Sequence, residues 1–375
     1  PRPAPLTVSE APSVRKSRFS VSSALAGALI VVFVAWSSGP AAVTGSPKTS
    51  MKSSPLTTTV MLLSWIWGPV AVRFTPPRSR TVPLTLRVFG LPLVFVATNA
   101  TLLAVLVGQV AEAGVKEISP GADWCGAVNA LSPGDELVLR PGEYQGSCTI
   151  RRGGTPGAPL VIRAKDPRHP PRIVYLGDSA NVLNIAAGHV TVRGLEFGPT
   201  LPNVDAVRIY AGTDITIEDC RFFEIAGIAV VANHASVHRI TIRRNGIVRS
   251  KATAMYFGCH DGFSCTASEL LIEQNYIHRV DAPASAIGYG VQVKLNSTAT
   301  IHDNVILDTK GPGIMVYGAT ELSRESVVER NFVAGSRTSS AIVVGGGPAI
   351  LRNNVAITSA EAGIGLENYG RRELL

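Results

Sequence analysis

Short hydrophobic segments with an alternating pattern recur along the second half of the chain. One set has the form apolar-x-x-(Asn or small apolar)-x-apolar and recurs at intervals of 23 to 30 residues. Its fourth position holds, in order, Leu195, Cys220, Asn245, Asn275, Asn304, Asn331 and Asn354. A second set of alternating segments lies between them, from DAVRIYAG at residue 205 to AGIGLENYG at residue 362. This periodicity indicates stacked structural units, each burying its apolar side chains against the next.

The repeats predict a parallel β-helix of about 8 to 9 coils. Each coil contributes short strands joined by polar or glycine turns, and successive coils stack at about 4.8 Å. An Asn at a fixed turn tolerates left-handed backbone geometry, and its amide can bond to the Asn of the next coil, so we expect the Asn column to be structural. A leucine-rich repeat is disfavoured because its leucine-dense consensus is absent. A globular βα fold is disfavoured because no long amphipathic helix separates the strands.

A cap is expected at the start of the β-helix, because an open end of stacked strands invites edge-to-edge association. Residues 122–131 have the pattern of a short amphipathic helix. We therefore assign residues 114–155 to an N-terminal cap and first coil, and residues 156–375 to the β-helix. The chain stops at residues 371–375 directly after a coil, so we expect a truncated C-terminus.

The first 113 residues differ in character from the rest and contain three apolar runs separated by Pro-, Ser- and Arg-rich stretches. The third run follows Arg87 and ends in Ala111-Glu112-Ala113, a small-x-small pattern typical of signal peptidase sites. We interpret residues 86–113 as a signal peptide cleaved after Ala113, with a membrane segment as the alternative. Residues 1–85 stay unassigned. The protein is expected to be secreted, periplasmic or on the cell surface, with membrane contact only through this N-terminal segment.

The formal charge of +8 is concentrated in that N-terminal region. Residues 1–113 hold ten Lys and Arg against two Asp and Glu, whereas residues 114–375 hold twenty-five of each kind. The predicted folded part is therefore neutral, and we expect no nucleic-acid partner.

The positions of the five cysteines in the repeat pattern indicate which of them form disulfides. Cys125 and Cys148 are placed to close the cap, and Cys259 and Cys265 bracket the short loop CHDGFSC. Both pairings suit an exported protein. Cys220 takes a slot of the Asn column and is expected to be a buried free thiol. No second Cys/His pair follows at zinc-ligand spacing, so we predict no metal site.

A family resemblance follows from the segments SPGDELVLRPGEY, GGTPGAPLVIRAKD and VTVRGLEF. This layout resembles the opening of right-handed parallel β-helix proteins and is similar to the alginate lyase and chondroitinase B group of polysaccharide lyases. The resemblance covers about residues 114–370. It implies a right-handed helix and an extracellular polysaccharide as partner, but the same scaffold carries several activities.

The side chains that leave the predicted strands define a candidate surface. With Val291 and Val293 inward, alternation places two columns outward. The first column is Arg208, Ala229, Tyr256, Gln292 and Met315, and the second is Tyr210, Val231, Gly258, Lys294 and Tyr317. Beyond the strands lie His260 and Asn296, and glycines 258 and 318 are expected to leave room for a polysaccharide chain.

This surface suggests β-elimination on a uronate, which needs a group for the carboxylate, a base for the alpha proton and an acid for the leaving oxygen. The resemblance implies Lys294 as the base, and Tyr317 is the candidate acid, with His260 as a further catalytic candidate. The candidate substrate-binding residues are Tyr256, Gln292, Asn296, Arg208 and Tyr210. The family's calcium-binding carboxylates have no clear counterpart, so we expect no cofactor, with calcium left open as the alternative.

Other functions fit the sequence less well. Inverting hydrolysis on this scaffold needs clustered acids on adjacent coils, and the outward columns supply only Glu367 near the end. The acid-rich signature of the alginate epimerases is absent. The alternative to an enzyme is a carbohydrate-binding or cell-surface structural β-helix that uses Tyr210, Tyr256 and Tyr317 as stacking platforms.

Overall fold

The computed structural model describes residues 113–319 and 325–367, together with the backbone of four strands from the first 112 residues. The chain divides into two compact units, Pro1–Ala111 and Glu112–Leu375. The first unit contains an antiparallel sheet in the order β1-β4-β3-β2, whose strands are β1 (Val31–Ala35), β2 (Leu84–Val88), β3 (Leu91–Thr98) and β4 (Thr101–Leu106). The side chains of the predicted export segment up to residue 112, and residues 371–375, lie outside the described part. No described helix has the length and apolar character needed to cross a membrane.

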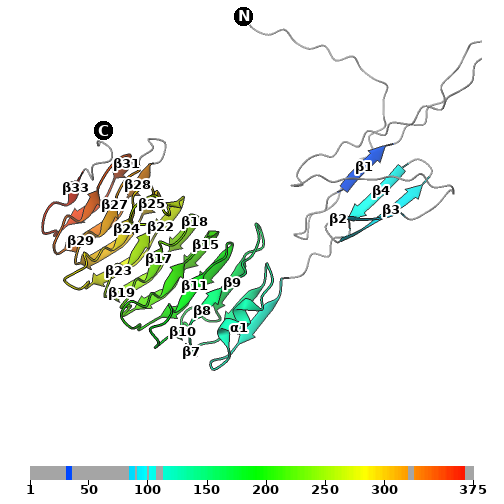
Figure 1. Ribbon diagram of the computed structural model, residues 1–375, viewed down its shortest axis with the longest axis horizontal. Coiled ribbons are helices and arrows are strands. Elements are labelled where there is room, and N and C mark those ends of the chain that lie inside the picture. Colours follow the sequence, from blue (N-terminus) through cyan, green and yellow to red (C-terminus); the bar gives the residue numbers. More distant parts are fainter. Residues whose placement is uncertain are drawn as a thin grey trace, which may run out of the picture. The chain divides into compact units, whose positions relative to one another are not determined.

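The second unit is a solenoid of three parallel sheets (Figure 1). The first sheet contains β5 (Val115–Ile118), β6 (Glu136–Leu139), β9 (Leu160–Ala164), β12 (Val190–Arg193), β15 (Gly212–Glu218), β18 (Val237–Arg243), β21 (Ala267–Ser268), β22 (Leu270–Glu273), β25 (Ala299–His302), β28 (Ser326–Glu329) and β31 (Ala349–Arg352). The second contains β7 (Glu143–Gln145), β10 (Arg172–Val174), β13 (Glu196–Phe197), β16 (Arg221–Phe223), β19 (Gly246–Ser250), β23 (Tyr276–Val280), β26 (Val305–Thr309), β29 (Phe332–Ser336) and β32 (Val355–Ile357). The third contains β8 (Cys148–Ile150), β11 (Leu183–Ile185), β14 (Val207–Ile209), β17 (Val230–Ala232), β20 (Met255–Phe257), β24 (Val291–Val293), β27 (Ile314–Val316), β30 (Ile342–Val344) and β33 (Ile364–Leu366).

The predicted parallel β-helix is confirmed, with about ten turns instead of the 8 to 9 expected. Each full coil contributes one strand to every sheet, so the segment around Asn245 is two strands, β18 and β19, and not one. Inward-facing aliphatic side chains from all three sheets form one continuous core along the solenoid axis. This core explains why short strands without a helix layer are stable, since each coil buries its apolar face against its neighbours.

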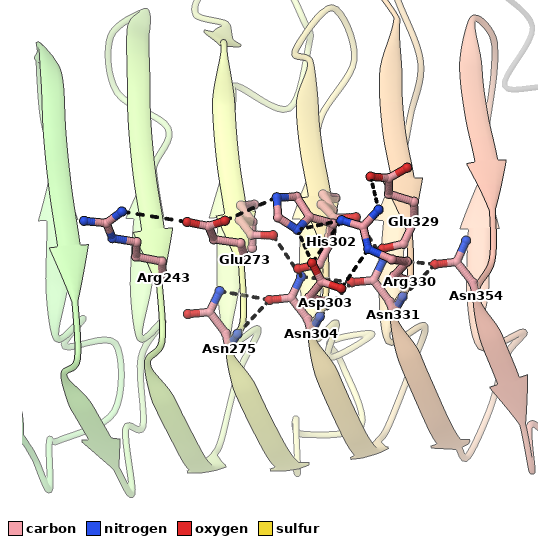
Figure 2. A network of polar contacts seen from close by, with 12 residues as sticks. Arg243, Glu273, Asn275, His302, Asp303, Asn304, Glu329, Arg330, Asn331 and Asn354 are labelled. Carbon is pink, nitrogen blue, oxygen red and sulfur yellow. Dashed lines mark hydrogen bonds and ion pairs between the residues drawn. The ribbon is translucent and has the colours of Figure 1, made fainter.

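The Asn column forms a hydrogen-bonded ladder at the bend between the first and second sheets (Figure 2). The Asn275 side chain shows the pattern: its Oδ1 accepts from the Asn245 backbone N–H at 3.0 Å, and its Nδ2 donates to Asn304 Oδ1 at 3.0 Å. The same Nδ2 lies 2.9 Å from the carbonyl oxygen of Ile242. The structural role predicted for these residues is therefore confirmed, because they accept from the backbone N–H groups of the bends from Cys220 to Asn331.

The left-handed residue at this bend is one position earlier than predicted. Positive φ angles occur at Arg244 (52°), Gln274 (56°), Asp303 (55°) and Arg330 (52°), each directly before a ladder Asn. The prediction of left-handed geometry at the Asn itself was wrong, because the Asn side chain must point inward to reach the ladder. The residue before it takes the sharp turn and exposes its own side chain.

The N-terminal cap contains the predicted helix, shortened to α1 (Trp124–Asn129). The Asp123 side chain caps it by accepting from the Gly126 N–H, and Trp124 is buried against the first coils. Both predicted disulfides are present, Cys125–Cys148 and Cys259–Cys265.

The fifth cysteine, Cys220, is buried and free, as predicted. Burial raises the pKa of its thiol to about 12, so this side chain behaves as a small apolar group of the core.

Charged side chains form a second column on the outer face of the first sheet, just before the ladder. The strand register aligns Arg193, Glu218, Arg243, Glu273, His302, Glu329 and Arg352. All neighbouring members except His302 and Glu329 form ion pairs across coils, and Figure 2 shows the part from Arg243 to Glu329. We call this set the charge column.

Candidate functional site

The outer face of the third sheet carries the residues singled out from the sequence. Strand pairing places Tyr256 beside Gln292 and Gln292 beside Met315, in the predicted register. The neighbour of Tyr256 on the preceding coil is Val231, so the prediction of Ala229 at that position was wrong by two residues. Strand β17 begins at Val230, because Ala229 belongs to the turn before it, and the alternation pattern alone does not distinguish these two registers.

Lys294 lies at the centre of this face. It follows Val293, which points into the core, and therefore points outward. Its ammonium group lies 3.9 Å from the ring centroid of Tyr317 and 5.8 Å from that of Tyr256. The residue is nevertheless only 3% exposed. Within the described part of the chain, no carboxylate forms an ion pair with this ammonium group.

Tyr317 and Tyr289 link their hydroxyl groups at 3.1 Å on the same face. The Gln292 amide donates to the Tyr317 hydroxyl at 3.4 Å. Tyr289 also packs with Met315 and Val343 in a small apolar cluster that is separate from the main core. Lys294, Tyr256, Tyr317, Gln292 and Tyr289 thus form one contiguous group, which we call the lysine–tyrosine cluster.

Tyr289 is a member that sequence reasoning missed. It begins the predicted alternating segment but precedes the observed strand β24, so strand alternation does not define which way its side chain points. Tyr256, a predicted member, is about half buried, and burial, together with the nearby Tyr317 and Asp261, raises the pKa of its hydroxyl. A protonated phenol is therefore the form expected beside Lys294 at neutral pH.

The two glycines next to the cluster do not leave space for a ligand, so that prediction was wrong. A Cβ at Gly258 would meet Ser297 Oγ at 2.2 Å, and one at Gly318 would meet the Gly346 carbonyl oxygen at 2.4 Å. Both glycines also have positive φ, 87° and 84°. They permit close stacking of adjacent coils at a tight turn.

Asn296 and His260 lie beside the cluster rather than in it. The Asn296 Nδ2 donates to the Gly262 carbonyl oxygen at 2.9 Å, so its amide supports the 259–265 loop. His260 is exposed on that loop, and its side chain makes no hydrogen bond or ion pair within the described residues. The structure therefore does not bring His260 into contact with Lys294.

Arg208 and Tyr210 lie on the same outer face, on and just after β14, three coils before Lys294. The Arg208 guanidinium pairs with Asp205 at 2.6 Å and donates to Asn233 Oδ1 at 2.8 Å. Tyr210 packs edge-on against the His234 ring. At about 4.8 Å per coil these groups are about 14 Å from the cluster along the axis. They belong to the same surface but not to the same contact group.

The cluster does not resemble a metal site. Its polar atoms come from amide, phenol and ammonium groups, whereas calcium prefers several carboxylate and carbonyl oxygens. Among residues 113–319 and 325–367, no three His, Cys, Asp or Glu side chains are grouped to bind a metal ion. The residues present therefore do not fit calcium.

Comparisons with known proteins concern the same solenoid. No curated protein sequence matches this chain significantly. Similar solved structures include an alginate lyase from Paenibacillus sp. str. FPU-7, with 14% identity, a TM-score of 0.49 and coverage of 68% of this chain and 98% of that one. The A-module of a mannuronan C-5 epimerase from Azotobacter vinelandii has 14% identity and a TM-score of 0.36, and the match covers 62% of this chain and 73% of that one. A pectate lyase has 11% identity and a TM-score of 0.37, covering 67% and 79%.

The family profile described as "Right handed beta helix region" matches residues 205–373. The matched range contains the Asn ladder from Asn245 onward and the whole lysine–tyrosine cluster. The three parallel sheets have the arrangement that this profile describes, so the fold of the second unit is a parallel β-helix.

Proposed function

We propose that this protein is exported and cleaves a uronate-containing polysaccharide by β-elimination at the lysine–tyrosine cluster. The single observation that carries the proposal is the setting of Lys294. A cation that is 3% exposed and lacks a carboxylate partner among the described residues is costly to bury. An anionic ligand that approaches this face would compensate the charge, and a uronate supplies a carboxylate.

The cluster also supports a division of roles in the reaction. As an ammonium ion, Lys294 neutralises the uronate carboxylate and makes the adjacent C–H bond more acidic. The Tyr317 hydroxyl, oriented by Tyr289 and Gln292, is the proton-transfer group. As the phenolate, Tyr317 accepts the alpha proton and becomes a phenol, the electron pair of the C–H bond forms a C=C double bond, and the C–O bond to the leaving sugar breaks. The same hydroxyl then returns the proton to the leaving oxygen, so no other reactant is needed.

This division exchanges the roles expected from the sequence, in which Lys294 is the base and Tyr317 the acid. Its basis is contact geometry, since the ammonium lies over the faces of two rings, an arrangement that favours a cation. Arg208 and Tyr210 are placed to contact the same polysaccharide chain further along the third sheet. His260 stays a prediction.

The test is the ultraviolet absorbance of the unsaturated product on a panel of polyuronates. We expect turnover by the wild type, and a loss of roughly 10²- to 10⁴-fold in kcat for Tyr317→Phe, the range for removing a proton-transfer group. Lys294→Ala should lose activity to a similar extent, whereas Lys294→Arg, which keeps the charge, should retain part of it. Absence of product from every polyuronate would refute the proposal.

A non-catalytic carbohydrate-binding function is the second candidate. It is favoured by the separation of His260 from the cluster and by the partly exposed side chains of Tyr256 and Tyr317 on one face. In that case polyuronate binding without product would be observed. Tyr256→Ala would abolish the binding and Lys294→Ala would leave it unchanged.

A further inference from the structure

The turn between the second and third sheets is much longer in the coil of Lys294 than in the coils on either side. Residues 281–290 connect β23 to β24, whereas residues 251–254 make this connection one coil earlier and residues 310–313 one coil later. Tyr289 lies near the end of the longer turn. The insertion in this coil therefore supplies a member of the lysine–tyrosine cluster.

The 281–288 loop, which forms most of this turn, has few side chains that can hold it in place. Its sequence is DAPASAIG, in which the alanine, proline, isoleucine and glycine residues have no hydrogen-bonding side chain. Asp281, at its start, pairs with Arg279 and Arg337. Most of the residues that follow are exposed. Exposed loops with few contacts change conformation readily, so a fixed position for the second half of this loop requires an anchor elsewhere.

That anchor is Lys310, which lies on the next coil. The Lys310 ammonium group donates to the carbonyl oxygens of Pro283 and Ala286. Hydrogen bonds from a charged donor are stronger than those between neutral groups. The Gly311 N–H, directly after this lysine, donates to the Gly288 carbonyl oxygen at 2.9 Å. The second half of the loop is thereby held against the next coil, up to the residue before the lysine–tyrosine cluster.

Tyr289 connects the end of this loop to Tyr317. Tyr289 is buried, and its carbonyl oxygen accepts from the Ala254 N–H of the preceding coil at 2.9 Å. Its hydroxyl lies 3.1 Å from that of Tyr317. A hydrogen bond weakens steeply when its geometry changes, so a displacement of the loop end alters the orientation of the Tyr317 hydroxyl.

We propose that Lys310 is a positioning residue for the β-elimination, which acts through the 281–288 loop and Tyr289 on the Tyr317 hydroxyl. The inference rests on the proposed function, because that function assigns the proton transfer to Tyr317. The transfer requires the hydroxyl to lie close to the alpha proton of the bound uronate, and a misplacement of about 1 Å costs up to about 10²-fold in rate. Lys310 itself contacts the loop and takes no part in the transfer.

The coil before the insertion provides a matched control. Lys251 begins the turn of residues 251–254, as Lys310 begins the turn of residues 310–313. The Lys251 side chain is exposed and makes no hydrogen bond or ion pair with the residues that the structure describes. The solenoid therefore does not itself require a tethering lysine at this position, and the tether goes together with the longer loop.

The experiment measures kcat and KM on a polyuronate that the wild type cleaves. We expect Lys310→Met to lower kcat about tenfold while KM changes by less than about twofold, because the loop does not contact the substrate. Lys310→Arg keeps a charged donor and should recover most of the loss. Lys251→Met should change neither value. Circular dichroism at the assay temperature checks that each variant is folded, and Lys310→Gln replaces Lys310→Met if the latter is not.

A double-mutant cycle tests the route through Tyr289. Tyr289→Phe removes the hydroxyl that contacts Tyr317, so adding Lys310→Met to it should lower kcat no further. Two effects that multiply would overturn the proposed route. Hydrogen exchange at residues 282–289 supplies a readout without substrate. It should be faster in Lys310→Met than in the wild type and in Lys251→Met, and equal rates would refute the tether.

The outcomes separate the positioning role from the proposed function. Turnover by the wild type with unchanged kcat in Lys310→Met refutes the positioning role and leaves the proposed function standing. A rise in KM at constant kcat also refutes it, because the loop would then contact the substrate. If the wild type cleaves no polyuronate, the proposed function fails and the positioning role fails with it.

Discussion

Two outer faces of the same solenoid differ in the partners that surround their buried charged side chains. On the first sheet, Glu218 is 1% exposed and is surrounded by three cations, Arg193, Arg243 and Arg244. On the third sheet, Lys294 is buried to a similar degree, and its neighbours are the rings of Tyr256 and Tyr317. Burial alone therefore does not distinguish a structural charge from the functional charge proposed at Lys294. The partner does, because a paired charge is already satisfied by the fold.

The titration behaviour of the first sheet agrees with a structural role. Burial opposes ionisation of Glu218, but hydrogen bonds from Arg243 and Arg193 outweigh it and keep its pKa below the usual range. Asp303, at the adjacent bend, has its pKa lowered to about 2 by hydrogen bonds from Arg330 and His302. Both carboxylates are thus charged at neutral pH, and their ion pairs are complete in the folded chain.

The largest effect on stability is expected from Glu218→Ala. The substitution leaves three arginines facing one another without their shared carboxylate, so the free energy of unfolding should fall by about 2 to 3 kcal/mol. Urea denaturation followed by circular dichroism measures this change. Asp178→Ala, at an exposed acid, is the control and should change stability by less than about 0.5 kcal/mol. Equal effects of the two variants would contradict a structural role of the charge column.

Lys294→Met should have a smaller effect of opposite sign. Removing a desolvated charge and keeping a side chain of similar length should leave the unfolding free energy unchanged or raise it by up to about 1 kcal/mol. Lys310→Met is the matched control, because the Lys310 ammonium donates to the Pro283 and Ala286 carbonyl oxygens and its loss should destabilise the protein. A marked loss of stability in Lys294→Met would mean that this lysine, too, serves the fold.

The smallest expected effect is a loss of stability at acidic pH. The pKa of Asp303 is lower in the folded than in the unfolded chain, so its contribution is present above about pH 4 and is lost as the pH falls through about 2. The pair is partly exposed, so the contribution should stay below about 1 kcal/mol. Unfolding curves between pH 5 and 2 measure it relative to Asp303→Asn. An identical pH dependence in the two proteins would exclude Asp303 from the acid response.

The repeat pattern was sufficient to predict the β-helix, the Asn ladder and the disulfides. The β-helix and the Asn ladder depend on residue types at a fixed position in successive coils, and a periodic position is visible in one sequence. The disulfides followed from the positions of the cysteines at the cap and around the 259–265 loop. The site was predictable only in part. Gln292 and Tyr256 follow strand alternation, whereas Tyr289 lies in a turn, where no period defines the direction of its side chain. The error at Ala229 has the same origin, because a two-residue shift keeps the alternation and changes the neighbours.

The sequence by itself determined which residues point inward, because a period of two and a coil-length repeat leave few ways to bury the apolar side chains. Only the tertiary structure decided which charges are satisfied. Whether a charged side chain meets a carboxylate or an aromatic ring depends on residues 23 to 38 positions away, such as Tyr317 and Tyr256 for Lys294, brought together by the stacking of coils. For Glu218 that stacking supplies arginines, and for Lys294 it supplies two tyrosines, so that under the proposed function the compensating anion is the substrate.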